Sequence, residues 1–189
     1  MNAVAIRAVG PSADVADVAR VIDALTALTV DTVDGGASIG FLGPARPDRI
    51  AAFWRRVLDA AARGDRALLL AERDGRIVGT VQLALDTPDN GPHRAEVAKL
   101  LVHRDARRRG IADRLLSAVE EEARARGRTL LVLDTVTGSD AERLYVRCGW
   151  TRVGVVPDYA LFPDGTPCDT TVFYKRLAPP DADPRPLGA

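Results

Sequence analysis

Residues 95–133 read AEVAKLLVHRDARRRGIADRLLSAVEEEARARGRTLLVL, and this stretch decides the fold. Residues 95–102 are expected to form a strand, and the helical pattern begins after Gly110 and ends at Gly127. Residues 130–133 form an apolar run suited to a strand buried on both faces. A strand, a helix and a second strand in this order are parallel and right-handed in nearly all cases, and they favour ligands at the carboxyl ends of the strands.

Five elements are expected before this unit. A strand covers residues 6–9, and Ser12 is positioned to cap a helix with apolar residues at helical spacing. A second helix carries Ile50, Phe53, Trp54, Val57, Leu58 and Ala61. Residues 67–72 and 77–85 form a hairpin around Asp74-Gly75, a pair that suits a tight turn. The loop at residues 34–43 is either plain surface or the wall of a substrate pocket.

The elements after the unit complete a sheet. Ser139 and Glu142 predict a capping box for a short helix through Arg147, which Cys148 and the glycine after it close. Cys148 is interpreted as a packing residue. Residues 150–156 and 170–177 form two further strands, joined by a Pro-, Gly- and Asp-containing loop at residues 158–168. We therefore predict one α/β domain at residues 1–177 and a flexible tail at residues 178–189.

Composition excludes several classes of function. The chain has 189 residues, 47% of them hydrophobic, and a formal net charge of zero, so no global field attracts nucleic acid or an anionic membrane. Two cysteines and two histidines make a zinc site or any other metal site unexpected, and neither histidine follows a nucleophile elbow. No segment is typical of a secretory signal or a membrane span, which predicts a cytoplasmic protein.

The segment from Arg107 to Ala112 lies between a strand and a helix and predicts an anion site. Its glycine lets backbone N–H groups approach a ligand, and the helix N-terminus adds the positive end of a dipole. Residues 103–114 hold five arginines against two aspartates, a local positive excess in a neutral protein. From this pattern alone, a phosphate cradle and a solvated basic turn both stay open. The glycine fingerprints of dinucleotide and nucleoside-triphosphate sites are absent.

Three segments in order resemble the GNAT family of N-acetyltransferases. They are the strand at residues 96–102, the loop Arg107-x-x-Gly110-x-Ala112, and Tyr145-Val146-Arg147-Cys148-Gly149-Trp150. Within the family, residues 93–97, 133–135 and 163–165 are similar to the tabtoxin-resistance type of acetyltransferase. The resemblance implies a mixed sheet of about seven strands with about four flanking helices and a splayed parallel strand pair. It also implies acetyl transfer from acetyl-CoA to an amine.

The resemblance also implies which residues hold acetyl-CoA. Leu100, Leu101 and Val102 match backbone positions that pair with the pantetheine arm, and main-chain pairing of this kind leaves side-chain identity free. The pyrophosphate loop is matched by Arg107, Arg108, Arg109, Gly110, Ile111, Ala112 and Asp113. One departure is Gly138, which stands where many members have an asparagine that touches the cofactor. Either Ser139 substitutes for that contact or the contact is absent.

Three residues are candidates for proton transfer. An alkyl amine is mostly protonated at pH 7 and must lose a proton before it attacks a thioester, so a base is needed. Glu96 and Asp134 lie on the two strands that flank the crossover helix, and they match the two acidic positions of the tabtoxin-resistance type. Tyr145 matches the general acid that protonates the departing thiolate. For each residue a structural role is the alternative.

The function expected from the sequence is acetylation of a small or amino-acid-like amine, including an antibiotic or toxin, by a protein that forms no complex with nucleic acid. Acetylation of a protein N-terminus or lysine is the alternative enzyme activity. An acyl-CoA-binding sensor is the non-enzyme alternative, against which Glu96, Asp134 and Tyr145 argue. A homodimer is compatible with the resemblance.

Overall fold

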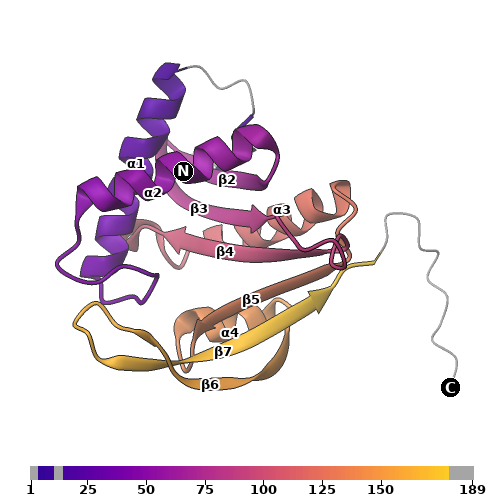
Figure 1. Ribbon diagram of the computed structural model, residues 1–189. Coiled ribbons are helices and arrows are strands. Elements are labelled where there is room, and N and C mark those ends of the chain that lie inside the picture. Colours follow the sequence, from indigo (N-terminus) through magenta and orange to yellow (C-terminus); the bar gives the residue numbers. More distant parts are fainter. Residues whose placement is uncertain (1–3, 11–14, 179–189) are drawn as a thin grey trace, which may run out of the picture.

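The computed structural model describes residues 4–10 and 15–178, which form one mixed sheet covered by helices on both faces (Figure 1). The strands lie in the order β1-β2-β3-β4-β5-β7-β6, and β4 and β5 are the parallel pair. The strands are β1 (Ala5–Ala8), β2 (Arg66–Arg73), β3 (Arg76–Ala84), β4 (Arg94–Val102), β5 (Leu130–Val136), β6 (Thr151–Leu161) and β7 (Pro167–Arg176). The helices are α1 (Val15–Asp34), α2 (Pro47–Arg63), α3 (Ile111–Ala125) and α4 (Asp140–Arg147), with a 3₁₀ turn at Arg104–Ala106. This confirms the predicted fold class.

Two apolar clusters hold the helices to the sheet. One packs α3 and α4 against residues of β2, β3, β4, β5 and β7, including Leu115, Leu131 and Phe173. The other packs α1 and α2 against β2 and β4 on the opposite face. In the second cluster Trp54 is fully buried, and its indole N–H donates a hydrogen bond of 2.9 Å to the Thr29 hydroxyl. A buried polar group with a partner loses little on burial, so the indole is a stable anchor for α2.

The parallel pair is joined at one end only. Arg94, Ala95 and Glu96 are in register with Leu130, Leu131 and Val132, and no pairing between the strands follows in the described residues. Figure 1 shows β4 and β5 together at their starts, on the right, and apart toward the left. The edge of β4 that faces the gap therefore has unpaired backbone groups from Val97 onward, as the splayed pair predicts.

A β-bulge in β4 reverses the faces of its second half. Thr80 of β3 pairs with Leu101, whereas Gln82 pairs with Ala98, so β4 has two residues where β3 has one. Lys99 occupies the bulge with a φ of 52°, an uncommon backbone conformation for a residue other than glycine. Before the bulge, Val97 packs toward α3, and after it Leu101 packs toward α1 and α2. One extra residue thus changes which face each side chain reaches.

The hairpin at the far edge is longer than expected. The predicted loop at residues 158–168 is wrong for most of its length, because β6 continues to Leu161 and β7 begins at Pro167. The pairing shifts between Val156 and Ala160, and this irregularity accommodates Pro157 and the positive φ of Asp158. Proline is tolerated on an edge strand and at a bulge, so it did not end this one.

Other expectations need smaller corrections. β5 extends beyond the predicted residues 130–133 to Val136, and it is not buried on both faces: Leu131 and Leu133 are buried, whereas Leu130 and Val132 are only half-buried. The tight turn at Asp74-Gly75 is confirmed by positive φ angles of 52° and 73°. The predicted cap at Ser12 and the tail after residue 178 lie outside the described residues.

Candidate active site

Glu96 and Asp134 lie on neighbouring strands and on the same face of the sheet. Glu96 is in register with Val132, two residues before Asp134 in β5. Successive side chains of a strand alternate between faces, and the flanking Val97 and Leu133 are buried against α3. Both carboxylates therefore face the side of α1 and α2, where they are exposed to solvent. The structure brings these two predicted residues together.

Lys99 lies near the two carboxylates, and no sequence pattern singled it out. Its side chain is largely shielded from water, which lowers the pKa of its ammonium below the usual 10.5, while the charges of Asp134 and Glu96 oppose this shift. The ammonium lies 5.7 Å from the centre of the Phe53 ring of α2. A bulge cannot be read from residue types, because a lysine in an apolar strand fits a surface edge equally well.

Tyr145 reaches the gap from the opposite face. Its ring is buried and makes edge contacts with Trp150, at 5.8 Å between ring centres, and a tilted contact with Phe173, at 6.0 Å. Burial, with a contribution from the negative charge of Asp134, raises the pKa of the phenol above its usual value. The hydroxyl has no hydrogen-bond partner among the described residues. It is thus protonated at neutral pH and available to a ligand.

The loop before α3 presents a row of backbone donors. Gly110 is the N-cap of α3 with a φ of 72°, and no side chain caps the helix. The N–H groups of residues 108–113 have no acceptor in the described part of the chain. Arg107 turns back and donates from Nε to the carbonyl oxygen of Val102 at 3.1 Å. This loop has the donors and the helix-end field that hold a phosphate group.

Asp113 and Ser139 have structural partners at this end of the sheet. Asp113 Oδ1 accepts a hydrogen bond of 3.0 Å from Arg147, which joins the first turn of α3 to the last turn of α4. Ser139 caps α4, its hydroxyl accepting from the backbone N–H of Glu142 at 3.2 Å. In the predicted capping box, the Glu142 carboxylate instead accepts from the N–H of Gly138. Cys148 packs beside them, with its sulfur 3.7 Å from Asp113 Oδ1.

The expected pantetheine positions line the gap. Leu100, Leu101 and Val102 belong to the part of β4 that has β3 on one side and no partner strand on the other. Their side chains pack into the two clusters, Leu101 toward α1 and α2 and the other two toward α3. The backbone at the edge of β4 is therefore held firmly from both faces.

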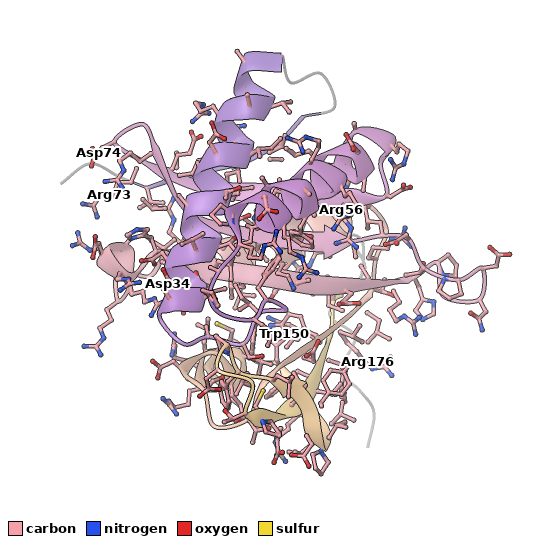
Figure 2. All side chains as sticks on the ribbon, turned by 60° about the vertical axis from the view of Figure 1, so that its left-hand side comes forward. Asp34, Arg56, Arg73, Asp74, Trp150 and Arg176 are labelled. Atoms are coloured by element: carbon pink, nitrogen blue, oxygen red, sulfur yellow. The ribbon has the colours of Figure 1, made fainter. Side chains whose placement is uncertain are left out.

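Two distant segments meet beside the carboxylates and form a wall. The Ser38 hydroxyl donates a hydrogen bond of 2.7 Å to the carbonyl oxygen of Leu161, and the N–H of Gly43 donates one of 2.8 Å to that of Pro163. The loop between α1 and α2 thus bonds to the tip of the β6–β7 hairpin, and the two lie side by side in Figure 1. Figure 2 shows Asp34 at the lower end of α1, where this loop begins. Lys99 lies under the wall, because a Cβ added to Gly40 would be 3.6 Å from its nitrogen.

Other features do not compete with this site. A hollow of about 690 Å³ between α1 and α2 is lined by Asp23, Val30 and Asp48 among others. None of the candidate catalytic or cofactor-binding residues lines it. Within residues 4–10 and 15–178, no group of three or more His, Cys, Asp or Glu side chains could hold a metal ion. None of the described helices has the length and apolar character needed to cross a bilayer.

Comparison with known proteins gives a consistent answer. Residues 39–150 match the profile described as the acetyltransferase (GNAT) family. A curated protein of Azospirillum brasilense named IAA acetyltransferase is 36% identical over 107 residues, which are 56% of this chain and 68% of that protein. An uncharacterised N-acetyltransferase of the same organism is 36% identical over 101 residues, 52% of this chain and 58% of that protein.

Solved structures agree over nearly the whole chain. A ribosomal-protein-alanine N-acetyltransferase of Brucella melitensis is similar at a TM-score of 0.75 and 25% identity, covering 92% of this chain and 99% of that one. The yncA protein of Salmonella typhimurium, solved with its cofactor acetyl-CoA, has a TM-score of 0.73 at 23% identity, covering 97% and 99%.

Proposed function

The chain belongs to the GNAT family of acetyltransferases, and from this premise we propose that it transfers the acetyl group of acetyl-CoA to the amine of a small molecule. The observation that carries the proposal is that candidate bases and a candidate acid lie on opposite sides of one gap in the sheet. Glu96 and Asp134 approach the space between β4 and β5 from the side of α1 and α2, and Tyr145 approaches from the side of α3 and α4. A base and an acid on opposite sides of a reacting thioester suit acyl transfer.

The described loop and gap fit acetyl-CoA. Six consecutive N–H groups at residues 108–113 are free to bind the pyrophosphate. The edge of β4 at residues 100–102 has no partner strand, although Arg107 engages the Val102 carbonyl oxygen, and this edge can pair with the pantetheine arm. Arg107, Arg108 and Arg109 add positive charge beside the loop. The bound thioester supplies the activated acetyl group.

Glu96 and Asp134 take the proton from the acceptor amine. Both carboxylates are exposed to solvent on one face, so an alkylammonium can bind between them. Once the ammonium loses its proton to a carboxylate, directly or through water, its nitrogen attacks the thioester carbonyl carbon and the new C–N bond forms.

Tyr145 protonates the sulfur as the carbon–sulfur bond breaks. Its raised pKa keeps the phenol protonated until the thiolate develops beside it. The first proton of the ammonium returns to solvent through the exposed carboxylates. The second, which the nitrogen loses as the amide forms, replaces the proton that Tyr145 gave to the sulfur, so the protons balance over one turnover. Neither aromatic neighbour of Tyr145 competes for the hydroxyl as a hydrogen-bond acceptor.

The wall over the site supports a small acceptor. Ser38 and Gly43 donate hydrogen bonds to the β6–β7 hairpin and so hold the two segments together. A peptide acceptor would have to separate them. The name of the Brucella melitensis protein indicates a ribosomal-protein acceptor for that enzyme. A protein acceptor needs a more open groove than this wall leaves. The relative named IAA acetyltransferase carries a name that fits a small molecule.

A thiol-release assay tests the proposal. Acetyl-CoA is mixed with the protein and a panel of amines and amino acids, and free CoA is detected with a thiol reagent while mass spectrometry measures the acetylated product. We expect at least one amine to be acetylated, and the Tyr145→Phe variant to be slower with that amine. Tight binding of acetyl-CoA without transfer to any panel member, peptides included, would instead favour an acyl-CoA sensor.

A further inference from the structure

Lys99 is a half-buried charged group that the proposed reaction does not use. It is one of only two lysines in the chain, and the other, Lys175, donates hydrogen bonds to Glu120 and to the carbonyl oxygen of Cys148. Lys99 has no hydrogen bond and no carboxylate oxygen within 4.0 Å among the described residues. A half-buried ammonium with no hydrogen-bond partner in the described part of the chain gives up part of its hydration, so its presence calls for an explanation.

The position of Lys99 is set by the backbone. The bulge and the positive φ of Lys99 take this one residue out of the alternation of side chains between the two faces of β4. The side chain extends under Gly40, and its ammonium lies over the Phe53 ring and keeps some contact with solvent. A lysine that only filled space would not need a strained backbone and an aromatic support.

The charged groups around Lys99 act on its ammonium in opposite directions. Glu96 and Asp134 are close enough to stabilise the ammonium, whereas Arg66 on β2 acts against it. In register, Arg66, Ala84 and Glu96 lie in one row across β2, β3 and β4. Arg66 is itself engaged, since it donates a hydrogen bond of 2.8 Å to Gln82. Lys99 is thus the cation beside the two carboxylates that has no hydrogen bond among the described residues.

We propose that Lys99 binds an anionic group of the acceptor, so that the substrate is an amino acid or another small amine that carries a carboxylate. This inference rests on the proposed function and names its substrate class. The ammonium of such a zwitterion meets Glu96 and Asp134, and its carboxylate meets the unpaired Lys99 beneath the wall. The carboxylate then receives a charge-assisted hydrogen bond in a site partly shielded from water.

Matched acceptors and variants test the inference by kinetics. Each L-amino acid that is acetylated is compared with its carboxamide, in the wild type, Lys99→Met and Lys99→Arg. Methionine keeps the length and the packing over Phe53 without the charge. We expect the wild type to prefer the acid through a KM about tenfold to a hundredfold lower, the range of a hydrogen bond to a charged group. Lys99→Met should lose that preference and Lys99→Arg should keep most of it.

The deciding quantity is the ratio of the KM for the amino acid to the KM for its carboxamide. General damage to the site affects both values and cancels in the ratio. An equal ratio in the wild type and Lys99→Met, or a wild type that accepts carboxamides as well as acids, overturns the inference while leaving acetyl transfer intact. Acetylation only of amines that lack a carboxylate would also overturn it. If no amine is acetylated, it is the proposed function that fails.

A binding measurement tests, without any turnover, whether Lys99 binds the carboxylate of the acceptor. The protein is labelled with ¹³C at Cε of lysine, and Lys99→Met assigns the two lysine signals. In the presence of CoA, we expect the amino acids to shift the Lys99 signal and to raise its pKa, and the carboxamides to leave it in place. The Lys175 signal is the internal control, since its ammonium is already bonded to Glu120. A Lys99 signal that no amino acid moves overturns the inference, whatever the assay shows.

Discussion

The two faces of the sheet differ in how completely they are covered. On one face, α3 and α4 pack against strands from β2 to β7 in a continuous apolar cluster, and Tyr145 is the one candidate catalytic group in it. On the other face, the cluster under α1 and α2 reaches Leu101 of β4 and includes no residue of β5. The uncovered part holds Glu96, Lys99 and Asp134.

This difference separates two tasks. The covered face carries one continuous segment, in which β4, the loop with Gly110 and α3 follow one another in sequence, and it is suited to hold a cosubstrate in a fixed position. The uncovered face is assembled from segments far apart, from Gly40 to Pro163, and it is suited to select the acceptor. Variants in the loop before α3 should therefore weaken acetyl-CoA binding, whereas variants at Glu96, Lys99 and Asp134 should leave it unchanged.

The largest effect is expected on the covered side, at Gly110. Gly110→Asp places a carboxylate among the free N–H groups, and two like charges about 4 Å apart repel by roughly 4 kcal/mol near a protein surface. We expect the affinity for acetyl-CoA to fall by about a thousandfold, as measured by calorimetry.

Gly127→Asp is the matched control for this variant. Gly127 has a similar φ of 69°, follows the other end of α3, and has open space around a new Cβ. It should cost similar stability through backbone strain and leave the affinity for acetyl-CoA unchanged. Equal losses of affinity in both variants would show that strain, and not charge in the loop, weakens binding.

The next effect concerns the carboxylates of the uncovered face. Glu96→Gln and Asp134→Asn should retain acetyl-CoA binding and lower kcat by about a hundredfold where the residue is the main base. The loss should be greatest below the pKa of the acceptor amine, because proton removal is then most needed. Rate measurements across pH check this, and two variants with wild-type rates at every pH would assign proton removal to water or to other groups.

A smaller loss is expected at Tyr145, the candidate catalytic group of the covered face. Tyr145→Phe removes an oxygen that has no partner among the described residues and keeps the ring against Trp150 and Phe173. The acetyl-transfer step should slow by about tenfold or more, with little change in melting temperature. An acyl donor with a more acidic thiol should reduce the loss. A variant that melts much earlier would instead assign Tyr145 a packing role.

The smallest effect is a pH dependence of stability caused by Lys99. Its pKa is lowered in the folded protein, so the unfolded chain binds more protons between that lowered value and the usual 10.5. Below this window the buried charge costs stability in full, and the cost disappears as the pH rises toward 10.5. Urea denaturation should find Lys99→Met more stable relative to the wild type at pH 7, with the difference decreasing at higher pH. A difference that stays constant with pH would contradict a buried charge.

Much of the covered face could be predicted from the sequence. The unit at residues 95–133 has regular helical spacing after Gly110 and a glycine at its end, and these local signals gave β4, α3 and β5 in the right order. Ser139 and Glu142 likewise predicted the start of α4. Each of these signals depends on residues within a few positions of one another.

The uncovered face could not be predicted, because its features arise from pairing between distant segments. Nothing in the letters around Lys99 indicates that β4 has one residue more than β3 at that point. In the β6–β7 hairpin, Pro157, Asp158 and Gly165 gave the composition of a loop, although the edge position and the irregular pairing accommodate Pro157 and Asp158 in a strand. Residue types describe local preferences, and tertiary pairing overrode them here.

The wall above Lys99 is held by hydrogen bonds to the main chain, since Ser38 and Gly43 donate to the carbonyl oxygens of Leu161 and Pro163. A carbonyl group is present whatever side chain its residue carries. Substitutions at the tip of the hairpin can therefore alter the lining of the acceptor pocket while the path of the chain persists. In evolutionary terms, the segment that we propose to select the amine can diversify one mutation at a time, and the loop carrying Gly110 need not change with it.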